Sequence, residues 1–233
     1  MLSTLNVSQT GMNAARIAVE NVSNNIANEN TVGYKKRVVQ VSELAQSDGR
    51  FTGRGVDSSA AYRITSQYMY DKIMSENTKA NYYDKVSNML GSIESIFSET
   101  EDSGFSADLN RYFQAIENLR TNPNSEIYKS VLKSSGSIVV ESLQNLYTSI
   151  EQQQLSEKTE LKVNVNKVNV LLKEIGDINV KLEKYEFNND LLDKRDQLEL
   201  ELSNYVDISV NRTGYYELKV AGEMAISNNT NVR

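Results

Sequence analysis

The stretch LKVNVNKVNVLLKEIGDINVKL, residues 161–182, decides the fold class of this 233-residue chain. Its large apolar residues recur in alternating steps of four and three, and one amide fills the remaining position of the series. The apolar positions are Leu161, Val165, Val168, Leu172, Ile175 and Leu182, and the amide is Asn179. This spacing places the side chains on one face of a helix, as in a coiled coil, where a single Asn commonly sets the register. The sequence therefore predicts a long helix that packs against another helix.

The same helical spacing extends over most of the chain on both sides of this stretch. It predicts helices over residues 60–98, 107–119 and 190–205, and a long helical run that begins at residue 125 and leads into the coiled-coil seam. Polar or proline-containing segments separate them, at residues 99–106, 121–124 and 188–189. We therefore expect a mainly α protein with a helical bundle domain at residues 60–205.

Residues 3–28 form a further predicted helix with two unlike faces. The apolar face has coiled-coil spacing and consists of Leu5, Met12, Ala15, Val19, Val22 and Ile26. The opposite face is uncharged and consists of Asn21, Asn24, Asn25 and Asn28. Asn is a poor helix former whose amide both donates and accepts hydrogen bonds, so this face suits polar contact with neighbours or confined water. An isolated helix of this kind is marginal in water, so its apolar face needs a partner from the same chain or from other subunits.

A turn and an extended segment follow this helix. Residues 28–34 are rich in Asn and contain Gly33; both residue types tolerate positive φ and favour a turn. Residues 35–59 are predicted to be an extended linker or loop with one short strand around Val38 to Val41.

The apolar period changes to two beyond residue 205, at Val206 to Val210 and again at Tyr216 to Val220. This predicts a β-hairpin, which is barely stable alone, so residues 206–233 are interpreted as the start of an incomplete β domain.

Composition excludes most catalytic chemistry. The chain has no Cys and no His, so thiolate nucleophiles, His-containing triads and Cys or His metal sites are impossible within it. The net charge of -6 argues against a nucleic-acid partner, and the short basic run from Lys35 to Arg37 is expected to be a solvated loop. Gly53-Arg54-Gly55 lacks the third glycine and the spacing of a phosphate loop.

No apolar run approaches the ~20 residues of a membrane-spanning helix, and the N-terminus does not resemble a cleaved signal peptide. The protein is therefore expected to be cytosolic or exported without a cleaved signal.

Two kinds of carboxylate arrangement are candidate chemical sites. Asp190, Asp193 and Asp196 could hold a cation, but Lys194 and Arg195 are near enough for local ion pairs, which explain the run equally well. A carboxylate-based hydrolase is compatible with the residue types, yet no Asp or Glu stands out and the chain has no Trp to hold a sugar. We therefore predict no catalytic residue, no cofactor and no metal.

The stretch SNNIANENTVGY, residues 23–34, resembles the N-terminal signature of the bacterial flagellar axial proteins, the family of rod, hook and hook-associated proteins. Four more segments resemble the hook-associated members at the hook–filament junction: GRGV at 53–56, SIESIF at 92–97, NPNS at 122–125 and DLLDKRDQL at 190–198. The last is the most specific, because rod and hook proteins lack it. Val32 replaces the usual proline of the signature. Members of the family are much longer and end in a helix that pairs with the N-terminal one, so this chain is expected to be the N-terminal part of such a protein.

The resemblance implies a structural subunit of a hollow helical tube, not an enzyme. Residues 1–34, the axial assembly helix with its signature turn, would form the inner layer, the bundle the next layer, and the β segment the start of an outer domain. The candidate assembly residues are the apolar positions Leu5, Met12, Ala15, Val19, Val22 and Ile26, together with Asn24, Asn25, Asn28, Asn30, Thr31, Gly33 and Tyr34.

The implied partners are other copies of the chain, the hook protein, the next junction protein and the flagellar type III export machinery. The resemblance places the protein outside the cell, in the flagellum at the hook–filament junction. The alternatives are a rod or hook subunit, another secreted coiled-coil component of a type III apparatus, and a phage-tail-like subunit.

Overall fold

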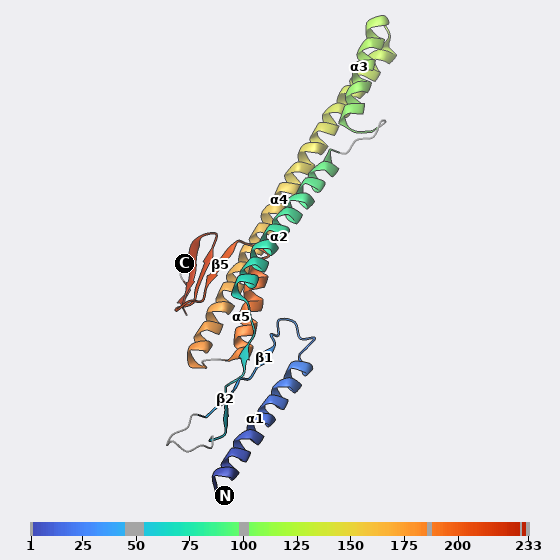
Figure 1. The fold of residues 1–233 in the computed structure, drawn as a ribbon. Coiled ribbons are helices and arrows are strands. Elements are labelled where there is room, and N and C mark those ends of the chain that lie inside the picture. The colour runs from blue at the N-terminus through green and yellow to red at the C-terminus, as the bar shows by residue number, and fades with distance from the viewer. Residues whose placement is uncertain (1, 45–53, 98–102, 186–187, 229, 232–233) are drawn as a thin grey trace. The chain divides into compact units, whose positions relative to one another are not determined.

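The computed structural model describes residues 2–44, 54–97, 103–185, 188–228 and 230–231. Helices make up most of these residues (Figure 1). They are α1 (Leu2–Ala27), α2 (Gln67–Ile96), α3 (Phe105–Thr121), α4 (Glu126–Lys184) and α5 (Asn189–Leu202). The mainly α class with a C-terminal β segment is therefore confirmed.

Two predicted helix boundaries were wrong. Helix α2 begins at Gln67 and not near residue 60, because the preceding residues pair with the linker: the Ile64 amide donates to the Lys36 carbonyl at 2.9 Å. Ser66 then provides an N-cap, and its hydroxyl accepts a 3.4 Å bond from the Met69 amide. Helix α5 ends at Leu202 and not at 205, since residues 203–205 form a turn.

The predicted linker is more ordered than a loop. Its described residues take part in two small antiparallel sheets. One pairs β1 (Arg37–Val38) with β4 (Tyr62–Arg63), which lies just after the predicted linker, and the other pairs β2 (Val41–Glu43) with β3 (Val56–Ser58). The C-terminal segment forms a four-stranded antiparallel sheet in the order β5-β6-β7-β8. Its strands are β5 (Ile208–Asn211), β6 (Glu217–Val220), β7 (Glu223–Ser227) and β8 (Thr230–Asn231). The predicted hairpin corresponds to β5 and β6.

The chain divides into two compact units whose boundaries fall inside α2 and α4. The first unit consists of residues 1–78 and 168–233, and the second of residues 79–167. This division cuts across the predicted bundle at 60–205 and joins the N-terminal segment, the linker and the β segment in one unit. The domain division at 1–34, 35–59, 60–205 and 206–233 therefore stays a prediction about the assembled protein.

The apolar core of the first unit lies where α4 and α5 meet the C-terminal sheet. Its fully buried members are Leu171, Ile175, Leu202, Leu218 and Ile226, with Met74 of α2 beside them. The C-terminal half of the predicted seam thus packs against α5 and the sheet. Leu218 and Ile226 of the β segment belong to the same apolar core as the helices.

Asn179 does not set a coiled-coil register. Its buried amide donates to the Asn228 carbonyl at 2.8 Å and accepts from Arg195 Nη1 at 2.9 Å. The Asn side chain can do both because its amide carries a donor nitrogen and an acceptor oxygen. Asn179 therefore joins α4 to the sheet and to α5.

The described residues of the second unit form almost no apolar core. Among its described residues only Asp108 and Ala115 are buried. Leu161 and Val165, in the N-terminal half of the predicted seam, are exposed, and so are Ile127, Val131, Leu143 and Ile150 of α4. Its helices are joined by polar contacts, such as those of Lys85 with Glu160 at 2.5 Å and with Glu157 at 3.3 Å.

Candidate assembly surface

The predicted apolar stripe of α1 is uncovered. Leu5, Met12, Val19, Val22 and Ile26 are between 54% and 70% exposed, and Ala15 is exposed as well. Helical side chains three, four and seven residues apart lie on one face, so these six form one apolar strip, which the polar Ser8 interrupts between Leu5 and Met12. Nothing among the described residues of this chain buries the strip.

The opposite face of α1 is covered by the linker, which runs beside the helix (Figure 1). Ala14 is 6% exposed, and β3 approaches the helix closely at Gly55. A Cβ at Gly55 would collide with Thr10 Oγ1, and its φ of 109° favours glycine. The Thr10 hydroxyl accepts a 3.3 Å bond from the Val56 amide, which fixes β3 on the helix.

Three asparagines of α1 contact the linker or the signature turn within the chain. Asn21 and Asn25 each donate to the Arg37 carbonyl, at 3.0 and 2.9 Å, and Asn25 Oδ1 accepts from the Arg37 amide at 2.9 Å. The Tyr34 hydroxyl lies within hydrogen-bond distance of Asn25 Oδ1 at 2.8 Å and of Asn24 Oδ1 at 3.0 Å. The uncharged face predicted from sequence is therefore satisfied within the chain.

The signature turn connects α1 to the linker. The Thr31 amide donates to the Asn28 carbonyl at 3.0 Å, and the Tyr34 amide donates to the Thr31 carbonyl at 3.1 Å. Gly33 has a φ of 82°, a conformation that glycine adopts without strain. Val32 is 85% exposed, so the turn forms without the usual proline.

Two further candidate residues lie near this turn. Asn30 is exposed, whereas Asn28 is half-buried and its amide donates to the Asn24 carbonyl at 2.9 Å. The thirteen candidate assembly residues thus divide into an exposed apolar strip and a polar set that organises the turn. Their contacts with other molecules stay a prediction.

In the described part of the chain, Asp190, Asp193 and Asp196 of α5 pair with basic residues that are distant in the sequence, and not with the nearby Lys194 or Arg195. Asp190 binds Arg37 at 2.5 Å, Asp193 binds Arg63 at 2.8 Å and Arg37 at 3.5 Å, and Asp196 binds Arg63 at 2.9 Å. Lys35 and Arg212 also pair with Asp196. The expectation of a solvated basic loop was therefore wrong for the half-buried Lys35 and Arg37.

Cationic partners oppose the effect of burial on the pKa of Asp196. Burial alone would raise the pKa of Asp196, but the hydrogen bond from Lys35 and the charges of Arg212, Lys35 and Arg63 hold that pKa below its ordinary value. Asp196 is therefore an ionised partner of several cations. Among the described residues, no group of three or more acidic side chains is arranged to hold a metal ion.

A second ionic group lies on the side of α5 that faces the sheet. The Tyr216 hydroxyl donates to Glu199 Oε1 at 2.9 Å, and Arg212 also binds this fully buried carboxyl group. Burial raises the pKa of Glu199 to about 7. Sequence reasoning did not single out Glu199, since its partner Arg212 and its burial by the sheet depend on the tertiary fold.

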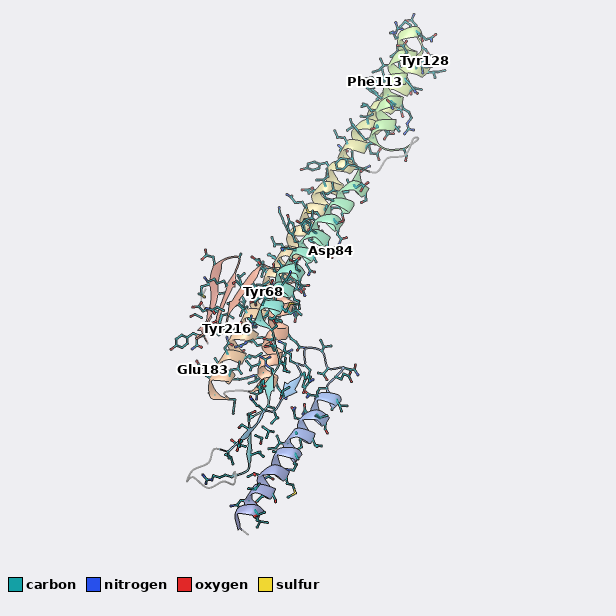
Figure 2. The ribbon with its side chains drawn as sticks, viewed as in Figure 1. Tyr68, Asp84, Phe113, Tyr128, Glu183 and Tyr216 are labelled. Atoms are coloured by element: carbon teal, nitrogen blue, oxygen red, sulfur yellow. The ribbon has the colours of Figure 1, made fainter. Side chains whose placement is uncertain are left out.

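The second unit presents more uncovered apolar surface. Phe113 lies on the exposed surface of α3 (Figure 2), and exposed apolar side chains recur along α4. Those of α4 include Ile127, Val131, Ile138, Leu143, Ile150 and Leu161. Large contiguous apolar surfaces typically mark interaction sites. None of the described helices combines the length and apolar character needed to traverse a bilayer.

Comparison with known proteins relates these features to a family. Residues 90–233 match the family model of the flagellar hook-associated protein FlgK helical domain, and residues 5–35 match that of the flagella basal body rod protein. The chain is 31% identical over 225 residues to flagellar hook-associated protein 1 of Bacillus subtilis (strain 168). It is 26% identical over 234 residues to flagellar hook-associated protein 1 of Salmonella typhimurium (strain LT2).

These alignments cover 90% and 95% of this chain but 44% and 42% of the relatives, so the chain spans less than half the length of each. A solved structure of the flagellar hook junction protein FlgK from Burkholderia pseudomallei has a similar fold. It matches with a TM-score of 0.61 and 17% sequence identity, over 70% of this chain and 29% of that chain.

Proposed function

We propose that this chain, which belongs to the flagellar hook-associated protein FlgK family, is a structural subunit that joins the flagellar hook to the filament. It acts by packing into a helical assembly with other copies of itself. Its neighbours are the hook protein on one side and the next junction protein on the other. The family is one of structural flagellar components, which fits a chain without His or Cys.

The observation that carries this proposal is the uncovered apolar strip of α1. Burying a large apolar side chain stabilises a protein by ~1.5–3 kcal/mol, so five such residues in one strip provide a strong drive for association. The linker binds the other face of α1, and the strip is the apolar face that is left for a partner. In the assembly, this partner is a helix from the same or a neighbouring subunit.

The match of residues 5–35 to the rod-protein family also supports an axial position for this segment. It does not favour a rod subunit, because the match over residues 90–233 is to the hook-associated helical domain. We propose that the protein reaches the hook–filament junction by export through the flagellar type III machinery, without a cleaved signal.

The experiment adds charge to the strip in the protein as its own bacterium produces it. The test variant combines Met12→Asp, Val19→Asp and Ile26→Asp. The control combines Asn6→Asp, Gln9→Asp and Asn13→Asp, which adds the same charge at exposed positions of the same helix outside the strip. Since all six positions are exposed, neither variant should change the thermal unfolding of the isolated chain.

We expect cells with the strip variant to secrete filament subunits without attaching them, and cells with the control to carry normal filaments. Electron microscopy and the amount of filament protein in the medium measure this difference. Normal filaments on cells with the strip variant would refute the proposed role of α1.

A further inference from the structure

The segment after the signature turn is bound to both α1 and α5. We call its described residues, 34–44 and 54–63, the strap. The Arg37 backbone is bonded to Asn21 and Asn25 of α1, whereas its guanidinium binds Asp190 and Asp193 of α5. Arg37 thus connects the N-terminal helix to α5.

Each carboxylate on this face of α5 meets a cation of the strap. Asp190 binds Arg37, Asp193 binds both Arg63 and Arg37, and Asp196 binds Arg63 and Lys35. Three acidic and three basic side chains therefore oppose one another. This complementarity identifies the strap as the occupant of the acidic face.

Burial distinguishes these contacts from ordinary surface ion pairs. The side chains of Arg37, Arg63, Asp193 and Asp196 are 14%, 12%, 11% and 6% exposed. Exposed pairs contribute little to stability, but loss of one partner from a poorly solvated pair leaves a charge without compensation. The contacts at Asp193 and Asp196 should therefore be strong, and the contact at the exposed Asp190 weak.

Apolar packing contributes little to the same attachment. All three residues of β2 are exposed, and the large side chains of the unit's apolar core come from α2, α4, α5 and the sheet, not from α1 or the strap. A further polar contact supports the geometry, since Gln197 of α5 donates to the carbonyl of Val32 in the signature turn. The attachment of α1 to its unit is thus mainly ionic and polar.

We propose that the acidic face of α5, formed by Asp190, Asp193 and Asp196, is an intramolecular docking site for the basic strap. It forms an electrostatic clasp that holds the N-terminal helix to the compact unit, and added salt loosens it. The inference gives a role to the segment DLLDKRDQL. It concerns the isolated chain and does not depend on the proposed function.

Hydrogen exchange on the 233-residue chain tests the clasp. The reporters are two amides bonded to strap carbonyls: that of Ser59 in the strap, bonded to the Gln40 carbonyl, and that of Ile64 directly after it, bonded to the Lys36 carbonyl. The amide of Leu218 in the central strand β6 of the sheet reports on the core. Raising NaCl from about 0.05 M to about 1 M stabilises the separated, solvent-exposed charges of the opened clasp, and should therefore speed strap exchange severalfold, while core exchange stays unchanged.

Two single variants and their combination test the contact directly. Asp193→Asn and Arg63→Gln should each speed strap exchange by about tenfold, after correction for the changed intrinsic rate next to residue 63. The double variant should have a smaller effect than the product of the two, because the two side chains act on each other. Asp177→Asn, an exposed substitution on α4, is the matched control and should have no effect.

Strap exchange that is independent of salt in the unaltered chain would overturn the clasp, whether or not the variants fold. Fully multiplicative effects of the two substitutions would also overturn it. Neither result would bear on filament attachment, and loss of attachment in the α1 strip variant would not bear on the clasp.

Discussion

The sheet and the helices of the first unit share one core, so truncation of Leu218 should weaken both. Leu218 is fully buried at the centre of β6 and belongs to the apolar cluster that contains Leu171, Ile175 and Leu202 of the helices. Leu218→Ala leaves a cavity bordered by strands and helices. We expect it to lower the stability of α5 and α4 as well as that of the sheet.

The expected loss of stability in Leu218→Ala follows from the full burial of this side chain. Replacement of a buried Leu by Ala costs about 2–5 kcal/mol, and full burial places Leu218 in the upper part of that range. For a unit of this size, each kcal/mol lowers Tm by roughly 2–4 °C. The matched control is Tyr215→Ala, which removes a large side chain that is 77% exposed and should change Tm little.

Thermal unfolding followed by circular dichroism measures the change in Tm, and hydrogen exchange measures the change in the stability of α5. A single transition that moves to lower temperature, with faster exchange in α5, is the expected result. If α5 kept its exchange rates in Leu218→Ala while the sheet lost protection, the sheet would be an independent domain and the shared core would be refuted.

Three other predictions concern the polar contacts. The pKa of Glu199 rises from 4.5 to about 7 on burial, so the folded state holds a proton that the unfolded state releases. This contribution is present below pH 4.5 and is lost as pH rises through 7; denaturant titrations should show a falling free energy of unfolding, a slope absent in Glu199→Gln. Gly55→Ala places a Cβ against Thr10 Oγ1 at positive φ and should cost roughly 1–2 kcal/mol, seen as faster exchange in β2 and β3. Asn25→Ala leaves the Arg37 amide without its acceptor, costs about 1–3 kcal/mol, and should speed exchange at that amide, whereas normal protection there would contradict the role of Asn25.

The sequence determined the parts of this protein that depend on local spacing. Apolar residues at steps of three and four predicted α1 and most of α2 to α5, and the change to a period of two predicted β5 and β6. The same reasoning predicted that the apolar face of α1 needs a partner, from the same chain or from other subunits, and no described residue of this chain buries it. Gly33 in a turn was likewise predictable, because positive φ is a property of a single residue.

Only the tertiary structure decided which side chains meet across the first unit. Lys35 and Asp196 are 161 positions apart, and Arg63 and Asp193 are 130 apart, so no local pattern could pair them. The basic residues were expected in solvent because a charge normally remains hydrated unless a partner replaces water, and that partner came from α5. In the same way, Asn179 could be recognised as a polar residue within an apolar seam, but its acceptor at Asn228 and its donor from Arg195 exist only once the sheet packs onto the helices.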